Sequence, residues 1–333
     1  MMIFLFISAL LSSCQPGSAE TSQAQVRISF SNAASEESLD GRLLLMFANN
    51  DKSEPRFQIN AGLNAQPVFG VNAEGLAPGE SVTFDQDVFG FPFESLSELE
   101  PGDYYVQALL HVYETFDLST GHQVKLPMDH GEGQQWNRSP GNLYSNPVKI
   151  TVAEKGKIDL DLVMDQVIPE IEEPADTEWI KHIKIKSEKL SAFWGRDMYL
   201  GAHVLLPKDF DKHPEAKYPL MVFQGHFPSD FGGFRTTPPE EGLEPDYSER
   251  FGVEGYNVMQ QQEAYDFYKR WNDPEFPRFL IIEIQHPTPY YDDSYAVNSA
   301  SQGPYGDAIT HELIPYIEEQ FRGIGEGWSR FLY

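Results

Sequence analysis

The sequence predicts two domains, an all-β sandwich followed by a domain in which strands and helices alternate (α/β). With 333 residues the chain is longer than one hydrophobic core usually serves. In its first half, apolar and polar residues alternate in short runs, a pattern typical of strands with one buried face. The second half holds near-continuous apolar runs and an amphipathic helix, which are typical of parallel strands covered by helices.

The N-terminal residues are typical of an exported bacterial lipoprotein. Residues 1–13 hold an apolar run of signal-peptide length, too short to span a membrane, and it ends in Leu-Ser-Ser before Cys14. This pattern resembles a lipobox, so we expect Cys14 to be acylated and residues 14–24 to form a tether. The protein is then anchored to a membrane by its lipid alone and faces the periplasm or the cell surface. Cys14 is the one cysteine in the sequence, so we expect no disulfide.

Residues 25–165 have the pattern of a β-sandwich. The predicted strands cover Val26 to Phe30, Leu43 to Ala48, Val148 to Val152 and Ile158 to Leu162. Clusters of Gly, Pro and Asn between these runs are typical of sandwich loops. The run that begins at Leu99 resembles a tyrosine corner, in which a Pro-Gly turn lets the Tyr104 hydroxyl bond the backbone upstream. We therefore expect an immunoglobulin-like sandwich.

A linker is predicted at residues 166–178, because proline and carboxylates concentrated there stiffen and extend a backbone. In residues 179–333 the apolar runs predict an antiparallel strand pair, then two parallel strands with a helix between them. The pair covers Ile183 to Ile185 and Met198 to Leu206, the parallel strands cover Leu220 to Phe223 and Phe279 to Ile284, and the helix lies around Val258 to Tyr268.

The last part of the chain holds the clearest helix. Its apolar residues recur every four positions and form one stripe at Ile309, Leu313, Ile317 and Phe321. A glycine-rich loop and a short apolar strand that ends at Tyr333 follow this helix. A helix, a glycine loop and a strand in this order precede the nucleophile elbow of α/β-hydrolases. The elbow motif itself, G-x-S-x-G, is not present in the 333 residues.

Three segments carry a resemblance to a known family. They are Ser191 to Asp211, Tyr218 to Pro228 and Phe279 to Tyr333. In order and spacing they resemble the esterase branch of the α/β-hydrolases, which is related to esterase D and enterochelin esterase. The resemblance implies hydrolysis of a carboxylic ester through an acyl-serine intermediate. It also implies that residues 179–333 are the N-terminal half of such a domain, with the nucleophile just after Tyr333 and the catalytic acid and histidine later. We therefore expect the chain to be an incomplete and inactive fragment.

The resemblance implies an oxyanion loop after the strand at Leu220 to Phe223. Its first donor would be the backbone amide of His226 or Phe227, because developing negative charge in acyl transfer needs fixed N–H donors. The residues alone fit a second interpretation equally well, in which Gly225 simply allows an ordinary turn after a strand.

The loop after the next strand holds a cluster of polar and aromatic residues. The candidates for a substrate pocket are His286, Tyr290, Tyr291 and Asp292. The carboxyl ends of strands are where α/β sheets bind ligands, and aromatic side chains there suit an acyl or sugar pocket. The alternative is a packed loop whose aspartates cap turns.

Composition and motifs limit the partners. A net charge of −27 argues against nucleic acid, because binding phosphates needs a basic surface. We expect no metal, since adjacent carboxylates on an extended chain point apart and no histidine pair has metal-ligand spacing. We expect no cofactor, since the sequence has no phosphate-binding glycine loop. The expected substrate is a small-molecule or glycan ester.

The sequence leaves two functions open. The first is the ester hydrolase of the resemblance, although this chain has no recognisable nucleophile, acid or base. The second is a non-catalytic surface lipoprotein that binds glycan or protein through its sandwich. Whether the chain is an enzyme is therefore uncertain from the sequence.

Overall fold

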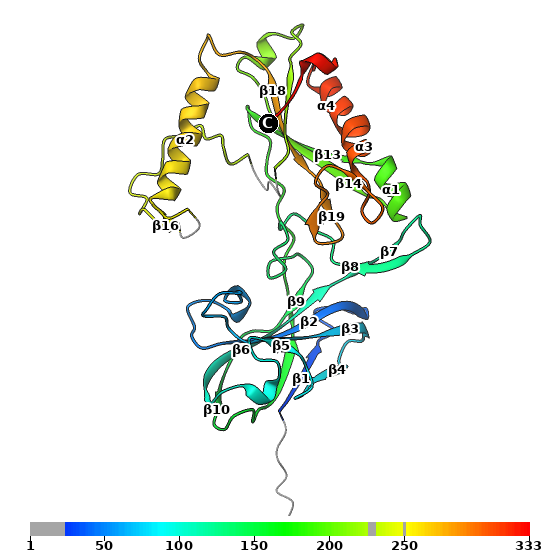
Figure 1. Cartoon of the computed structure of the whole chain (residues 1–333), viewed down its shortest axis with the longest axis vertical. Helices are drawn as coiled ribbons and strands as arrows, with labels where there is room; N and C mark the ends of the chain where they lie inside the picture. The colour runs from blue at the N-terminus through cyan, green and yellow to red at the C-terminus, as the bar shows by residue number, and fades with distance from the viewer. Residues whose placement is uncertain (1–23, 226–230, 249–250) are drawn as a thin grey trace, which may run out of the picture.

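The computed structural model describes residues 24–225, 231–248 and 251–333. These residues are mostly β-sheet with few helices, and they form an elongated molecule (Figure 1). The buried apolar side chains gather in two large clusters, one drawn mainly from the first half of the chain and the other from the second. Among the described residues no helix is long and apolar enough to cross a membrane. The division into two domains stays a prediction.

The first half forms two sheets that face each other across one core. Their strands are β1 (Gln25–Phe30), β2 (Leu39–Ala48), β3 (Val68–Leu76), β4 (Ser81–Phe84), β5 (Gly90–Phe91), β6 (Gly102–Val112), β9 (Leu143–Tyr144), β10 (Val148–Val152), β11 (Asp159–Met164) and β12 (Gln166–Val167). One sheet has the order β11-β1-β4, and the other has the order β12-β9-β6-β2-β3-β5, with β10 paired to β6. Strands β1 and β11 pair in parallel.

Burial explains the strand patterns of this half. Val26, Ile28 and Phe30 of β1 are fully buried and alternate with more exposed residues, which confirms the predicted strand. On β2, Leu45 belongs to the large core between the sheets. Its neighbour Met46 points to the other face, in a smaller cluster with Leu109 and Ile168, so the strand is apolar on both faces as predicted.

The hydrogen bond predicted for the tyrosine corner is confirmed. The Tyr104 hydroxyl donates to the backbone oxygen of Glu100 at 3.0 Å. Its ring meets the ring of Phe47 edge-on, with 5.9 Å between centroids. The corner therefore ties the start of β6 to the preceding turn and to the core at once.

The second half is built around a five-stranded sheet. Its elements are β13 (Ile180–Lys186), α1 (Glu188–Trp194), β14 (Tyr199–Leu205), β15 (Leu220–Phe223), α2 (Tyr256–Trp271), β18 (Leu280–Gln285), α3 (Tyr305–Ala308), a π-helical turn (Ile309–Leu313), α4 (Ile314–Gln320) and β23 (Arg330–Leu332). The order is β13-β14-β18-β15-β23. Strands β13 and β14 pair antiparallel, and β15 pairs in parallel with β18 and with β23. These pairings confirm the predicted antiparallel pair and parallel strands.

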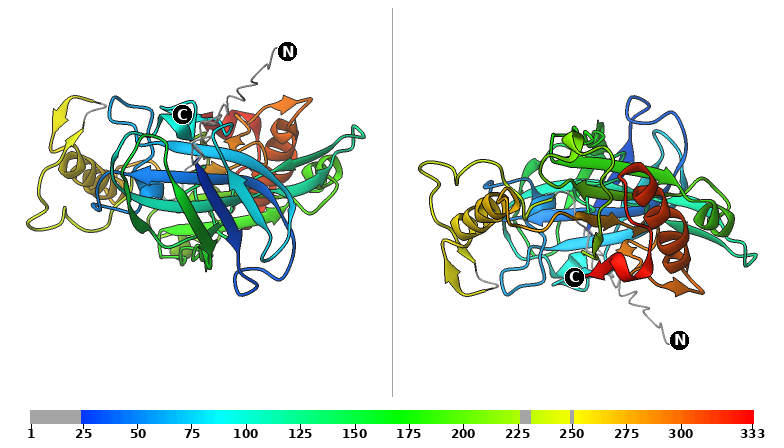
Figure 2. Two further views of the ribbon diagram at one scale, coloured as in Figure 1. Left: turned by 90° about the horizontal axis from the view of Figure 1, so that it is seen from below. Right: turned by 90° about the horizontal axis from the view of Figure 1, so that it is seen from above.

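Helices cover this sheet on both faces, which explains its near-continuous apolar strands. One face packs against α3 and α4, and Leu220 and Ile282 lie in a shared cluster with Leu313. The other face packs against α2, where Ile281 lies with Trp271. The views from the side and from above both place α2 and the α3–α4 pair on opposite sides of the strands (Figures 1 and 2).

The second half also contains short strands outside the five-stranded sheet. They are β16 (Tyr247–Ser248), β17 (Val253–Glu254), β19 (Pro287–Thr288), β20 (Asp292–Asp293), β21 (Asn298–Ser299) and β22 (Gly303–Pro304). In the long C-terminal helix the predicted stripe is confirmed at Ile309, Leu313 and Ile317, which are buried. Its fourth member, Phe321, lies just after the end of α4 and is partly buried against the same core.

Two features join the halves more closely than the sequence suggests. The hairpin of β7 (Glu114–Asp117) and β8 (Gln123–Leu126) lies within the segment predicted as sandwich, but Phe116 is buried in the core of the second half. Its ring lies 5.3 Å from the ring of Trp194 in α1. At the predicted linker, β12 still pairs with β9, and only residues 169–178 are exposed without helix or strand.

Candidate functional site

The parallel strands define one edge of the sheet as the candidate site. Strand β15 lies between β18 and β23, and all three run in the same direction. The chain leaves β15 through α2 to reach β18, then returns through α3 and α4 to β23 on the other side. In sheets of this kind ligands bind at the carboxyl ends of the strands, where the order reverses. We call the carboxyl ends of β15, β18 and β23 the carboxyl edge.

At this edge the end of β23 lies directly beside the end of β15. The backbone N–H of Tyr333 donates to the oxygen of Val222 at 3.0 Å. The rings of Tyr333 and Phe223 lie 5.7 Å apart. The loop that leaves β15 at Gln224 therefore starts next to the end of β23. The oxyanion candidates His226 and Phe227 belong to this loop but lie outside the described residues, as does Cys14.

Beyond β18, His286 is buried and bonded to Ser294. Their side chains lie 2.8 Å apart, from His286 Nδ1 to Ser294 Oγ, and the two residues are 2% and 0% exposed. The backbone N–H of Ser294 also donates to Nδ1, at 3.3 Å. Because a backbone N–H can only donate, Nδ1 is an acceptor, and a neutral His286 carries its proton on Nε2.

This pair has the distance of a nucleophile and its base, but not the exposure. A serine within about 2.6–3.2 Å of a histidine fits nucleophilic catalysis. Ser294, however, has no exposed surface, and its Oγ also accepts the backbone N–H of Ala296 at 3.1 Å. The pair therefore holds the loop together. Ser294 was not among the predicted site residues, since no motif surrounds it and only the fold brings it back to His286.

The other three pocket candidates do not meet in one cavity. The ring of Tyr290 lies 5.9 Å from Trp194, while the ring of Tyr291 lies 5.0 Å from His111 of β6. The carboxylate of Asp292 accepts the next backbone N–H at 2.8 Å. The structure thus brings His286 to Ser294, but it directs Tyr290 and Tyr291 to different neighbours.

Burial controls protonation around Tyr291. Burial, together with the nearby carboxylates of Glu132 and Asp129, raises the pKa of the Tyr291 hydroxyl well above its usual range. Burial lowers the pKa of His111 to about 4. At neutral pH, Tyr291 is therefore a protonated phenol beside a neutral imidazole.

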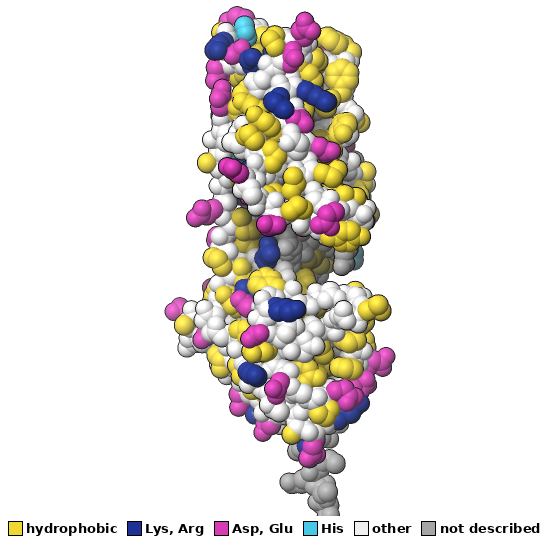
Figure 3. All heavy atoms as spheres, turned by 90° about the vertical axis from the view of Figure 1, so that its left-hand side faces the viewer, with side chains coloured by type: hydrophobic (Ala, Val, Ile, Leu, Met, Phe, Trp, Pro, Cys, Tyr) yellow, Lys and Arg dark blue, Asp and Glu magenta, His cyan; other side chains and the backbone are white. Residues whose placement is uncertain are grey.

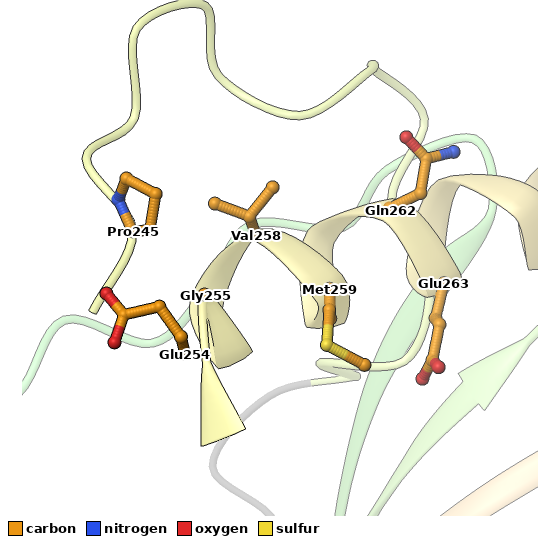
Figure 4. Close-up of a pocket in the computed structure, with 7 residues that line it drawn as sticks. All are labelled: Pro245, Glu254, Gly255, Val258, Met259, Gln262 and Glu263. Atoms are coloured by element: carbon orange, nitrogen blue, oxygen red, sulfur yellow. The ribbon is translucent and has the colours of Figure 1, made fainter. Parts of the chain in front are cut away.

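Two surface hollows lie away from the carboxyl edge. The first, of about 540 Å³, surrounds the start of α2. There Val258 and Gln262 point to one side of the helix, and Met259 and Glu263 point to another (Figure 4). The second, also of about 540 Å³, lies beside Phe193 and the β21–β22 pair. Neither is lined by a predicted site residue. In the described part of the chain, no group of His, Cys, Asp and Glu is arranged to hold a metal ion.

The face of the molecule shown in Figure 3 carries no large patch of one charge. Acidic and basic side chains are spread among apolar ones over both halves of the molecule.

Comparisons with known proteins give weak likenesses to esterases. No protein-family model matches the chain, and no curated protein matches it. Among solved structures, a ferulic acid esterase is 19% identical over 46% of this chain, with a TM-score of 0.26. A thermostable esterase is 9% identical over 94% of this chain and 69% of its own, with a TM-score of 0.25. The chain thus spans about half the length of the ferulic acid esterase, since its match with that protein covers 49% of it. Both TM-scores are low, so neither likeness by itself establishes a shared fold.

Proposed function

We propose that the protein is an esterase-like hydrolase that cleaves a carboxylic ester through an acyl-serine intermediate. The observation that carries this proposal is the position of Tyr333 beside Phe223 at the carboxyl edge. A serine on a tight turn after β23 would attack next to the loop that leaves β15. That loop holds His226 and Phe227, whose backbone amides we propose as donors to the oxyanion.

The substrate is proposed to be a small-molecule or glycan ester. Its site lies at the carboxyl edge, with the loop after β18 as one wall. His286 supports that wall through Ser294, and no metal or cofactor takes part in the proposed reaction. The roles of acid and base belong to residues later in such a domain than Tyr333.

We further propose the organisation around this site. Residues 25–165 form an immunoglobulin-like sandwich, residues 166–178 form the linker and residues 179–333 belong to the hydrolase domain. Residues 1–13 are a signal peptide, and Cys14 carries the lipid that anchors the exported protein. The tyrosine corner at Tyr104 supports the proposal of an immunoglobulin-like sandwich.

The gene beyond the codon for Tyr333 provides the test. We expect a G-x-S-x-G turn directly after this codon, in the same frame or a shifted one. A product extended through the hydrolase domain should hydrolyse p-nitrophenyl acyl esters and react with a fluorophosphonate probe. Replacing the serine of that turn by alanine should abolish both. The chain that ends at Tyr333 is the matched control and should do neither.

Two outcomes would contradict the proposal. One is a downstream sequence without a serine elbow. The other is an extended product that has the elbow but neither turns over esters nor reacts with the probe. Specific retention of the protein on a glycan column, together with either result, would favour the non-catalytic surface lipoprotein.

A further inference from the structure

We propose that a loop of the sandwich clamps the substrate-side loop at the carboxyl edge and so sets how tightly the ester binds. The clamp loop is residues 129–134, and the edge loop is residues 286–296. This inference rests on the proposed function and deepens it. It assigns to the first half of the chain a positioning role in the site of the second half.

The two loops share an unusual concentration of backbone strain. Six non-glycine residues in the described part of the chain have a positive φ, and four of them lie in these loops. They are Gln134, Tyr291, Tyr295 and Ala296. A positive φ is costly for a residue with a large side chain and persists only where the surroundings hold it. The edge loop therefore carries a local conformational cost that its contacts must offset.

The clamp loop contacts the edge loop directly through a hydrogen bond. The Gln134 side-chain amide donates to the backbone oxygen of Tyr291. His111 of β6 meets the ring of the same residue, Tyr291, edge-on at 5.0 Å. Residues of the first half thus contact both the backbone and the ring of Tyr291.

The clamp loop is itself preorganised to make this contact. The Asp129 carboxylate is 7% exposed and accepts the backbone N–H groups of Gly131 and Gln134, both at 2.7 Å. His130 Nε2 lies 3.0 Å from a Glu114 carboxylate oxygen in the β7 strand. Glu114 also pairs with Arg196, just after α1. The donor of Gln134 is therefore fixed before any ligand binds, which limits the entropy lost on forming the site.

The β19–β20 hairpin connects Tyr291 to the buried pair of His286 and Ser294 at the end of β18. Tyr291 lies at the tip of the β19–β20 hairpin, where its N–H donates to the Thr288 oxygen at 3.3 Å. This hairpin begins directly after His286 and ends directly before Ser294. Loss of the hydrogen bond to Tyr291 would therefore make the whole edge loop more mobile, including its ends at His286 and Ser294. Such a wall contacts ground state and transition state alike, so its loss raises KM and leaves kcat nearly unchanged.

The first test needs no catalysis and uses the 333-residue chain. Gln134→Glu keeps the shape of the side chain but removes the donor, and Gln134→Lys restores a donor. We expect amide hydrogen exchange at Tyr291 and Ala296 to be about 2- to 10-fold faster in Gln134→Glu, because one hydrogen bond is lost. Gln134→Lys should return toward the parent rate. Gln135→Ala, at the exposed neighbouring position, is the matched control and should leave these rates unchanged.

The second test uses the extended enzyme. Gln134→Glu should raise KM for a p-nitrophenyl ester several-fold at constant kcat, and Gln134→Lys should recover most of this loss. Unchanged exchange rates in Gln134→Glu would overturn the clamp whatever the enzyme does. Faster exchange with no change in KM would overturn its role in binding. An extended product that lacks esterase activity would refute the proposed function, while the exchange data would still decide whether the clamp exists.

Discussion

The ring of Phe223 at the end of β15 lies 5.7 Å from the ring of Tyr333 at the end of the chain. These residues are far apart in the sequence, and parallel pairing of β15 with β23 brings them together. The loop that follows Phe223 therefore starts beside the end of β23. This relationship depends on what holds the short strand β23 in place.

An ion pair fixes β23 to the helix before it, and breaking the pair should destabilise the second half. Arg330 contacts both carboxylate oxygens of Glu318, at 2.8 and 2.6 Å, and Glu318 is 7% exposed. Arg330→Ala leaves this carboxylate buried without its partner and should cost about 1 to 3 kcal/mol. Urea unfolding monitored by tryptophan fluorescence measures the loss.

Two variants control this experiment. Arg330→Lys keeps the charge but not the two-pronged geometry, so its loss should be smaller. Lys269→Ala removes the exposed Lys269–Asp266 pair and should have no measurable effect. Equal midpoints for Arg330→Ala and the parent would show that β23 is held in another way.

The tyrosine corner should stabilise the sandwich through one hydrogen bond. Tyr104→Phe keeps the ring contact with Phe47 and loses only the bond to the Glu100 oxygen, so we expect a loss of about 0.5–1.5 kcal/mol. The neighbouring variant Tyr105→Phe loses a bond to the exposed Asp51 carboxylate and should cost less. Thermal unfolding of both variants compares them directly, and the idea fails if Tyr105→Phe costs as much.

His111 should make the protein less stable at acid pH. Its pKa falls from 6.5 to about 4 in the folded state because it is buried. Between these pH values the unfolded chain binds more protons, so the free energy of unfolding decreases as pH drops from 6.5 toward 4. His111→Phe keeps the ring contacts without the titration. Its urea midpoint should therefore change less with pH across this window.

His130 provides a control with the opposite sign. Glu114 raises the pKa of His130, so its stabilisation is complete below the pKa of the unfolded chain and is lost as pH rises through the folded value. In the parent, the free energy of unfolding should therefore fall as pH rises above 6.5. His130→Gln has no such titration, so its free energy of unfolding should fall less over the same range. An equal pH dependence for His111→Phe and the parent between pH 4 and 6.5 would contradict the role assigned to His111.

The proposed acylation of Cys14 can be tested by where the protein is found in cells. Cys14→Ala should leave the protein unprocessed or release it from membranes, because a diacylglyceryl group supplies two chains at about 0.8 kcal/mol per buried methylene. Membrane fractionation and labelling with a radioactive fatty acid measure this. A variant that remains in the membrane fraction and still takes up label would disprove acylation at Cys14.

Local sequence patterns determined the main strands of the first half and the long C-terminal helix. The alternation at Val26, Ile28 and Phe30 and the four-residue spacing from Ile309 to Ile317 record which side chains are buried. Burial has the period of the element that carries it, so such patterns can be read without knowing the partner. The turn before Tyr104 was predictable for the same reason, since the bond it makes is local.

Only the tertiary structure decided which elements meet. No local pattern in the sequence predicts that β15 lies between β18 and β23. The same is true of the contact of His286 with Ser294 and of the hydrogen bond from Gln134 to Tyr291. Phe116 looks like any apolar residue of a sandwich strand, yet it is buried against Trp194 in the other half. A periodic pattern says that a face is buried but not against what, because the hydrophobic effect is non-directional and close packing selects the partner only in the assembled fold.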